Sequence, residues 1–276
     1  MKLRRACIIG HPVAHSRSPL IHGYWLRTLG IEGAYDFKDL SPEEFPGFLA
    51  SLEKNGYVGG NVTVPHKEAA YRMVAAHDAA AEAVGAVNTL WLEGGRLLGG
   101  NSDVHGFLAN LDDRAPGWDA HGPRAVLLGA GVGARSAAYA LKKRGVEVAL
   151  VNRTRARADE LAARFGARAC GADALPRLLA EADLLVNCTS LGMAGKPPLE
   201  IDLAPLKPGA VVCDLVYVPL ETPLITQARR RGHRTVDGLG MLLQQAGFGF
   251  RKWFGGDPRV TPELRAMIEA DINARS

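Results

Sequence analysis

The chain has 276 residues, of which 47% are hydrophobic and 22% are charged. This length exceeds the usual size of a single hydrophobic core and favours two domains, and the composition excludes disordered and fibrous proteins. The net charge is only +4, and no basic run interleaved with aromatic residues predicts nucleic-acid binding. Because no apolar stretch has the length of a signal peptide or a membrane span, we expect a soluble, cytoplasmic protein.

The four cysteines lie far apart along the chain and form no C-x-x-C pair. Each lies in or beside an apolar stretch, which favours buried, reduced thiols. These cysteines are Cys7, Cys170, Cys188 and Cys213.

The first distinctive stretch is "GHPVAHSRSPLIH", which contains three histidines and two serines. A metal site, a serine nucleophile with its base and a polar pocket are the alternatives. No carboxylate lies close in sequence to His11, His15 and His22 to complete a ligand set, which disfavours zinc, and no glycine elbow surrounds the serines. We therefore predict no metal in this protein.

The same stretch contains a helix-start signal. Ser18 followed by Pro19 predicts a serine N-cap with proline in the first turn, and free amides there favour an anion. Ser16 and Ser18 can then offer their hydroxyls to a carboxylate.

Short apolar runs alternate with helical patterns along the whole chain, which predicts mainly parallel sheets covered by helices. In the first third we expect strands in "ACIIG", "AYDFKDL" and "GGNVTV", with helices near 19–29 and 42–54. The stretch "AVNTLWLEGGRLLGGNSD" predicts a hairpin that turns at Glu93-Gly94-Gly95-Arg96.

A polar stretch, "DDRAPGWDAHGP", marks a change of composition just before Arg124 and a candidate domain boundary. Four strands are expected beyond it, in "AVLLGAG", "VEVALVNRT", "DLLVNCTS" and "AVVCDLVY". Two helical patterns follow, from Leu239 and from Pro262, with no further strand to pair. We expect them to pack back on the first domain, and we set the domains at 1–102, completed by 239–276, and 103–238.

Three glycines, Gly129, Gly131 and Gly133, stand directly after an apolar strand and before a helix. In that context backbone amides can approach a pyrophosphate at the helix N-terminus, and Ala134 fits the third small position. The pattern predicts a dinucleotide site, although the glycines could instead serve only to shape the turn.

The end of the next strand decides between NAD and NADP. Asn152 stands where an NAD site places its carboxylate, and Arg153 follows it, with Arg155 and Arg157 nearby. Arginines without an acid suit a 2′-phosphate and so favour NADP. The alternative is a solvated first helical turn capped by Thr154.

The block "NVTVPHKE" puts Asn61, Thr63 and Lys67 at the end of a strand and the start of a helix. Open α/β sheets hold ligands at this edge. A single lysine at such an edge is nevertheless most often an ordinary surface residue.

Together these blocks resemble the shikimate dehydrogenase family over nearly the full chain. The resemblance rests on "GHPVAHSRSPLIH", "NVTVPHK", "GAVNT", "GNSDVHGF", "GAGVGARSAAYAL", "NRT", "NCTSLGM", "DLVYVPLETPL" and "DGLGMLLQQ". It implies an α/β fold with a mixed, mainly parallel substrate domain and a Rossmann-type NADP-binding domain. The implied activity is the reversible NADP-dependent reduction of 3-dehydroshikimate to shikimate, in aromatic amino acid biosynthesis.

The resemblance makes Lys67 and Asp103 the catalytic dyad, and a lysine paired with a carboxylate can relay the hydroxyl proton. Asp103 could also serve as a helix N-cap. Other implied substrate ligands are Ser16, Ser18, Asn61, Thr63, Asn88, Tyr217 and Gln245. Taken singly, Asn88 could close a turn and Gln245 could lie on a solvated helix face.

The implied cofactor contacts follow the glycine loop, the phosphate clamp and the path to the nicotinamide. They are Gly129, Ala130, Gly131, Val132, Gly133, Ala134, Asn152, Arg153, Thr154, Arg157, Thr189, Ser190, Met193, Val216, Gly238 and Met241.

Three positions depart from the family pattern. Val132 follows Gly131 where the family often has a second glycine, Val218 replaces an asparagine, and Ser102 replaces the threonine of "NTD". These changes bear on cofactor geometry and leave the dyad intact.

Two rival functions are a quinate/shikimate dehydrogenase that uses NAD and a non-enzymatic NADP-binding sensor of the same fold. The sequence is compatible with a monomer and with a homodimer.

Overall fold

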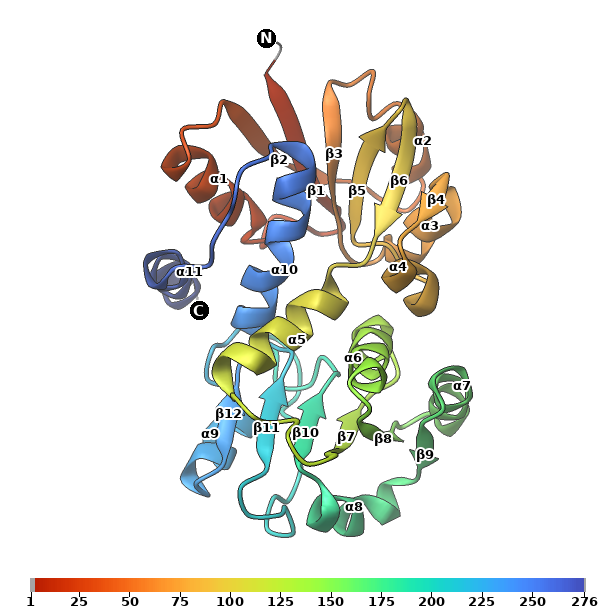
Figure 1. Ribbon diagram of the computed structural model, residues 1–276, viewed down its shortest axis with the longest axis vertical. Helices are drawn as coiled ribbons and strands as arrows, with labels where there is room; N and C mark the ends of the chain where they lie inside the picture. Colours follow the sequence, from red (N-terminus) through yellow and green to blue (C-terminus); the bar gives the residue numbers. More distant parts are fainter. Residues whose placement is uncertain (1–2, 276) are drawn as a thin grey trace. The chain divides into compact units, whose positions relative to one another are not determined.

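The computed structural model describes residues 3–275 and contains two six-stranded sheets (Figure 1). By their contacts, the residues form two compact units. One unit takes the chain up to Ser102 together with Gln245–Ile268, and the other takes Asp103–Gln244 and the chain from Glu269 onward.

The first sheet has the strand order β2-β1-β3-β5-β6-β4. Its elements are β1 (Arg4–Gly10), α1 (Ser18–Thr28), β2 (Gly33–Asp39), α2 (Phe45–Ala50), β3 (Tyr57–Val62), α3 (Lys67–Met73), β4 (Ala76–His77), α4 (Ala79–Val84), β5 (Thr89–Glu93) and β6 (Arg96–Gly100). Strands β2, β1 and β3 run parallel, whereas β5 is antiparallel to both of its neighbours. The expected mixed, mainly parallel sheet is therefore confirmed.

The expected hairpin is present between β5 and β6. Glu93 pairs with Arg96, and the two glycines between them have positive φ angles of 58° and 73°. Two consecutive residues with φ above zero make the tight turn that matches the twist of a hairpin.

Helix α2 is shorter than the segment 42–54 expected for it. The Ser51 hydroxyl donates to the carbonyl oxygens of Gly47 and Phe48 at 2.8 and 3.2 Å, and the helix ends at Ala50. A serine that bonds back to the preceding turn competes with the helical backbone pattern.

The second sheet is wholly parallel and has the order β12-β11-β10-β7-β8-β9. Its elements are α5 (Asp103–Arg114), β7 (Arg124–Leu128), α6 (Val132–Lys143), β8 (Glu147–Val151), α7 (Arg155–Phe165), β9 (Arg168–Cys170), a 3₁₀ turn (Ala172–Ala174), α8 (Leu175–Glu181), β10 (Leu184–Asn187), β11 (Val211–Asp214), α9 (Pro223–Arg230) and β12 (Arg234–Val236). The four expected strands are its centre. Two further strands of three residues each were not predicted: β9 lies between β8 and β10 in the chain and extends one edge, and β12 follows β11 and extends the other. Between Val236 and Arg275 the chain forms no strand, as expected.

The chain ends in α10 (Gly238–Trp253) and α11 (Pro262–Arg275). Residues 245–268 pack on the first unit: Trp253 Nε1 donates to the Leu90 carbonyl at 2.7 Å, and Trp25 Nε1 donates to the Arg259 carbonyl at 2.8 Å. The expected return of the C-terminal helices is thus observed for these residues, whereas Gly238–Gln244 and the chain from Glu269 cluster with the second unit.

All four cysteines are free thiols. Cys7 and Cys213 are buried as expected, but Cys170 and Cys188 are only partly buried. Cys170 ends an edge strand, where one side has no neighbouring strand to cover it.

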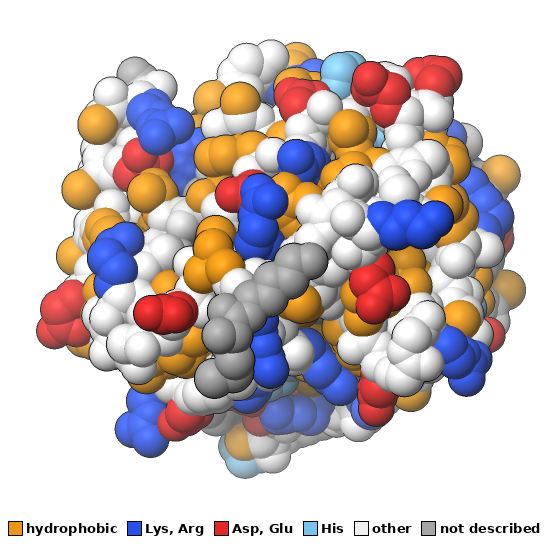
Figure 2. All heavy atoms as spheres, turned by 90° about the horizontal axis from the view of Figure 1, so that it is seen from above, with side chains coloured by type: hydrophobic (Ala, Val, Ile, Leu, Met, Phe, Trp, Pro, Cys, Tyr) orange, Lys and Arg blue, Asp and Glu red, His pale blue; other side chains and the backbone are white. Residues whose placement is uncertain are grey.

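On the face shown in Figure 2, basic, acidic and apolar side chains are interspersed. The small positive surplus is therefore not gathered into one patch on that face. Among residues 3–275, no helix is both long enough and apolar enough to cross a membrane.

Candidate active site

The carboxyl edge of the first sheet gathers polar side chains. Strands β3 and β6 end at this edge, and the antiparallel β5 begins at it with Thr89. Thr89 pairs with Asn61 on one side and with Gly100 on the other. Asn88 and Ser102 flank these strand ends and therefore lie at the same edge, where α/β sheets hold ligands.

Three predicted substrate ligands here carry amide side chains, and all three are buried: Asn61, Asn88 and Gln245. The Asn61 Nδ2 donates to the Asn88 carbonyl at 3.2 Å and to Thr89 Oγ1 at 3.3 Å. The Asn88 Nδ2 donates to Gln245 Oε1 at 3.5 Å. The structure thus brings the three amides together, and the alternative of a solvated Gln245 was wrong.

Three hydroxyl groups that the sequence analysis did not select as ligands belong to this cluster. They donate to the amide oxygens, Tyr35 to Asn61 at 2.6 Å, Thr89 to Asn88 at 2.9 Å and Ser102 to Gln245 at 2.8 Å. The backbone N–H of Ser102 also donates to the Asn88 oxygen, at 2.8 Å. Thr89 and Ser102 stand inside motif blocks and could have been found there, whereas no sequence signal singles out Tyr35.

The loop after β1 carries the two predicted serine ligands. The Ser16 hydroxyl lies 3.2 Å from the Ser18 hydroxyl and also accepts from the Ser18 N–H at 3.3 Å. The predicted serine N-cap was wrong by one position, because the N-cap is Arg17 and Ser18 is the first residue of α1. Arg17 has helical φ and ψ angles, and its carbonyl accepts the first helical bonds, from Leu20 and Ile21.

The histidines of that loop have separate surroundings. His11 Nδ1 lies 2.6 Å from Asp39 Oδ1 on the surface, and His15 is exposed. His22 is fully buried, stacks on Tyr35 with ring centroids 4.1 Å apart, and burial lowers its pKa to about 3. Within residues 3–275, no three His, Cys, Asp or Glu side chains are grouped so as to hold a metal ion.

Lys67 is the first residue of α3 and is partly buried. The turn before it is tied down on both sides, because Thr63 N donates to the Ile9 carbonyl at 2.8 Å and His66 Nε2 lies 2.7 Å from the Leu40 carbonyl. The His66 ring also stacks on Phe45 at 4.4 Å. Thr63 and Lys67 therefore have a rigid backbone at the carboxyl edge.

Asp103 is the first residue of α5, follows Ser102 directly and is buried. It begins the second unit of the chain. A carboxylate in a first helical turn is favoured by the helix dipole, so a local structural role is compatible with a catalytic one.

The glycine loop joins β7 to α6 in the second unit. Gly129 has a φ angle of +111°, and a Cβ there would lie 3.1 Å from Thr189 Cγ2, so both conformation and space favour glycine. A Cβ on Gly131 would meet no atom within 4 Å, and no side chain caps α6 there. Open space beside uncapped helical amides fits the pyrophosphate of a dinucleotide.

The other predicted residues of the loop complete this turn. Ala130, Val132 and Gly133 are partly exposed, whereas Ala134 is buried. A Cβ on Gly133 would lie 3.4 Å from Leu215 Cδ1. The helix therefore packs closely on the sheet.

The predicted phosphate clamp follows β8. Arg153 and Arg157 are exposed, and neither forms an ion pair with any residue between 3 and 275. Arg155 is already engaged, by Asp159 at 2.8 Å. Thr154 is the N-cap residue of α7 in an exposed first turn, as the alternative interpretation expected, but its side chain makes no capping hydrogen bond. Its carbonyl accepts from Asn152 Nδ2 at 2.8 Å.

A buried network supports the loops after β10 and β11. The Asp214 carboxylate accepts from Asn187 Nδ2, Thr222 Oγ1 and Val216 N at 2.9, 2.7 and 3.0 Å. Asn187 Oδ1 in turn accepts from Thr189 N and Oγ1 at 3.0 and 2.7 Å. Burial raises the pKa of Asp214 although these donors oppose it.

The sequence analysis missed Asn187 and Asp214. The available signal was a polar residue that ends each of two adjacent apolar strands. Ser190 and Met193, which follow in the loop, are exposed.

The remaining predicted residues lie at the start of α10 and in the loop before α9. A Cβ on Gly238 would lie 2.4 Å from the Leu215 carbonyl oxygen, so only glycine fits there. Tyr217 and Met241 are partly exposed, and Val216 is buried.

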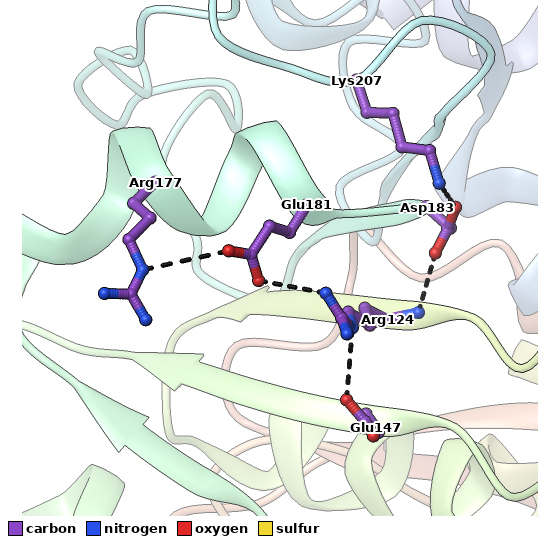
Figure 3. Close-up of polar contacts among 6 residues, drawn as sticks. All are labelled: Arg124, Glu147, Arg177, Glu181, Asp183 and Lys207. Atoms are coloured by element: carbon purple, nitrogen blue, oxygen red, sulfur yellow. Dashed lines mark hydrogen bonds and ion pairs between the residues drawn. The ribbon is translucent and has the colours of Figure 1, made fainter.

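At the amino edge of the second sheet, where β7 and β8 begin, the side chains are charged and aliphatic. A cavity of about 420 Å³ opens there among the starts of β7 and β8 and helix α8. Arg124 lines this cavity. It pairs with Glu147 at 3.3 Å and with Glu181 at 3.1 Å (Figure 3). The cavity lining holds charged and aliphatic side chains but no hydroxyl or amide side chain, and does not match a polyhydroxylated ring.

Two sequence models of known families match the chain. The one described as "Shikimate dehydrogenase substrate binding domain" matches residues 8–90, and "Shikimate / quinate 5-dehydrogenase" matches residues 113–194. The shikimate dehydrogenase (NADP(+)) of Mesorhizobium japonicum is 58% identical, over 98% of this chain and 97% of that protein. That of Azorhizobium caulinodans is 54% identical, over 99% and 98%.

Solved structures are similar over nearly the whole chain. Shikimate 5-dehydrogenase from Thermus thermophilus, in complex with NADP(H) and shikimate, has a TM-score of 0.88 and 36% identity, covering 98% of this chain and 100% of that one. Quinate dehydrogenase from Corynebacterium glutamicum, in complex with NAD, has a TM-score of 0.88 and 30% identity, covering 97% and 99%.

Proposed function

The chain belongs to the shikimate dehydrogenase family, and we infer that it catalyses the reversible NADP-dependent reduction of 3-dehydroshikimate to shikimate. The observation that carries this function is 58% identity along nearly the whole length of a shikimate dehydrogenase (NADP(+)). The family implies a place in aromatic amino acid biosynthesis, in the cytoplasm. Light scattering distinguishes a monomer from a homodimer.

The proton chemistry falls to Lys67 and Asp103. The bound cofactor would supply the hydride chemistry, as NADP+ in the direction of alcohol oxidation and as NADPH in the direction of ketone reduction. The alcohol proton must leave as the ketone forms, and a lysine paired with a carboxylate can accept and release it. In the reverse direction the Lys67 ammonium donates that proton to the carbonyl oxygen.

Substrate recognition falls to uncharged side chains in the chain up to Ser102, together with Tyr217 and Gln245. Buried amides suit a ring with several hydroxyls, because a ring that lacks one of them leaves a buried partner unpaired. The Ser16 and Ser18 hydroxyls, with Thr63, are assigned to the carboxylate.

Cofactor binding falls to the unit that begins at Asp103. The open space at Gly131 suits the pyrophosphate. Arg153 and Arg157 are exposed and form no ion pair with any residue from 3 to 275, which suits a 2′-phosphate. Asn152 and Thr154 shape this turn, while Thr189, Ser190 and Met193 border the path to the nicotinamide.

A quinate/shikimate dehydrogenase that uses NAD is the second candidate, favoured by the likeness to the C. glutamicum enzyme. Kinetics with both cofactors and both substrates separate the two. Shikimate-dependent reduction of NADP, followed by nicotinamide absorbance, supports the main function, and a higher kcat/KM with NAD contradicts the cofactor assignment. If the protein binds NADP but turns over neither substrate, the remaining interpretation is a non-enzymatic NADP-binding sensor of the same fold.

A further inference from the structure

Each of the three amide ligands at the carboxyl edge of the first sheet receives a hydrogen bond from a different hydroxyl group. The donors are Tyr35, Thr89 and Ser102, and each donates to a side-chain carbonyl oxygen at 2.6 to 2.9 Å. We propose that these three residues, the hydroxyl frame, are positioning residues that fix which edge of Asn61, Asn88 and Gln245 faces the substrate. This inference rests on the proposed function and concerns which residues determine its substrate specificity.

An amide needs such support because its two edges have opposite hydrogen-bonding character. The oxygen only accepts and the NH₂ only donates, so a rotation by 180° exchanges an acceptor for two donors at nearly the same shape. A hydroxyl has one proton to donate, and placing it on the oxygen makes one of the two orientations much more favourable.

Asn61 is the most completely determined of the three. Its two amide hydrogens go to the Asn88 carbonyl at 3.2 Å and to Thr89 Oγ1 at 3.3 Å, and its oxygen accepts from Tyr35. The side chain is 4% exposed. What Asn61 can still offer to a ligand is the second lone pair of its oxygen, so it should accept from a ring hydroxyl.

Tyr35 reaches Asn61 from a neighbouring strand. Tyr35 on β2 pairs with Ala6 on β1, and Ala6 pairs with Gly59 on β3, two residues before Asn61 on the same face. The register of three strands therefore carries the hydroxyl across β1 to the amide.

A ring contact positions the phenol, and burial keeps it protonated. The His22 ring stacks on it at 4.1 Å with an angle of 18° between the planes. Burial raises the pKa of Tyr35 well above its ordinary value, against a hydrogen bond from Ser18, so the proton stays on the oxygen. Tyr35 thereby links the predicted carboxylate anchor to the predicted ring-hydroxyl acceptor.

The frame continues at the other two amides. Asn88 Oδ1 accepts from the Thr89 hydroxyl and from the Ser102 N–H, at 2.9 and 2.8 Å. The Ser102 hydroxyl donates to Gln245 Oε1, and Thr89 and Ser102 lie 3.3 Å apart. The position where the sequence departs from the family's threonine thus retains the hydroxyl.

The kinetic test compares Tyr35→Phe with Tyr57→Phe. Both variants remove one phenol hydroxyl from the same sheet, but the Tyr57 hydroxyl donates to Asp36 at 2.9 Å, away from the amides. We expect Tyr35→Phe to raise the KM for shikimate about tenfold, with kcat within about threefold and the KM for NADP unchanged. Tyr57→Phe should leave all three constants near wild type.

Ser102 gives an independent variant pair. Ser102→Ala should raise the KM for shikimate by a similar factor, and Ser102→Thr, which keeps the hydroxyl, should restore it. Equal KM values for Tyr35→Phe and Tyr57→Phe, or for Ser102→Ala and Ser102→Thr, overturn the inference. Circular dichroism and thermal melts of every variant report loss of fold separately.

A measurement without substrate separates this inference from the proposed function. In ligand-free protein, the side-chain NH₂ resonances of Asn61 in a ¹⁵N spectrum should shift and exchange faster with solvent in Tyr35→Phe, but not in Tyr57→Phe. Unchanged Asn61 resonances overturn the positioning role whether or not the wild type is active. A wild type that fails to reduce NADP with shikimate overturns the function instead.

Discussion

The carboxyl edge of the first sheet and the amino edge of the second use polar groups in opposite ways. At the first, uncharged amides and hydroxyls are buried and each carbonyl oxygen has a specific donor. At the second, Arg124, Glu147 and Glu181 form ion pairs while they stay 43% to 76% exposed (Figure 3). Solvent screens the exposed pairs, whereas a buried polar group without its partner pays the full cost of its lost hydration. The loss of one partner should therefore cost more among the buried neutral groups than among the exposed ion pairs.

The largest expected effect lies at the carboxyl edge, in Lys67→Ala. Loss of the group that carries the proton should lower kcat by about 10² to 10⁴ with little change in the KM for shikimate. Steady-state kinetics of NADP reduction measure this, and Lys54→Ala, an exposed lysine of the same unit, is the control. A Lys67→Ala variant as active as the control would remove the acid/base role.

The next largest effect tests whether a buried hydrogen-bond network also determines stability in the second unit. Asp214→Ala leaves Asn187, Thr222 and Val216 without their common acceptor and should lower the free energy of unfolding by about 2 to 4 kcal/mol. Urea unfolding gives this value, with Asp113→Ala on an exposed face of α5 as the control. Similar stabilities for the two variants would contradict the importance of the network.

A smaller effect, on the KM for NADP, is expected from Arg153, an exposed charge assigned to the 2′-phosphate. Arg153→Ser should raise the KM for NADP about 10- to 100-fold, because a charge-assisted hydrogen bond to the 2′-phosphate is lost, and leave the KM for NAD unchanged. Arg155→Ser is the matched control, since Arg155 already pairs with Asp159. If the KM values for NADP and for NAD rise by the same factor, Arg153 does not bind the 2′-phosphate.

The smallest effects belong to the ion pairs of Figure 3. Arg124→Gln should change the free energy of unfolding by at most about 1 kcal/mol, less at high salt. A loss of several kcal/mol would show that this edge is more than a solvated surface.

Asp183, in the same cluster, provides the pH test. Burial alone would raise its pKa, but hydrogen bonds from Lys207 and from the Arg124 N–H outweigh burial and lower it. A carboxyl whose folded pKa is lowered stabilises the fold above its ordinary pKa and loses that contribution as pH falls through the lowered value. Asp183→Asn should therefore flatten the acid side of a stability–pH profile and leave the alkaline side unchanged.

The sequence was sufficient where a pattern repeats over many residues. Apolar runs in β7, β8, β10 and β11 predicted the centre of the second sheet, because buried parallel strands are apolar on both faces. It was insufficient for β9 and β12, since three residues carry no periodicity and their pairing depends on the strand beside them.

The candidate site shows the same limit. Asn61, Asn88 and Gln245 stand in motif blocks, so the resemblance selected them. Tyr35 does not, because its role depends on which residues the register of three strands brings together. The serine N-cap was misplaced by one residue because Ser-Pro fits the first turn as well as the cap.

The indole of Trp253 lies over Gly59 and donates to the Leu90 carbonyl. A segment near the end of the chain therefore completes the packing of strands made near its beginning. During synthesis, the strands of the first sheet emerge from the ribosome long before this indole, and their packing is completed only after residues 103–252 have been translated. In the cell, the first sheet should therefore complete its packing after the strands of the second sheet, β7 to β12, have been made.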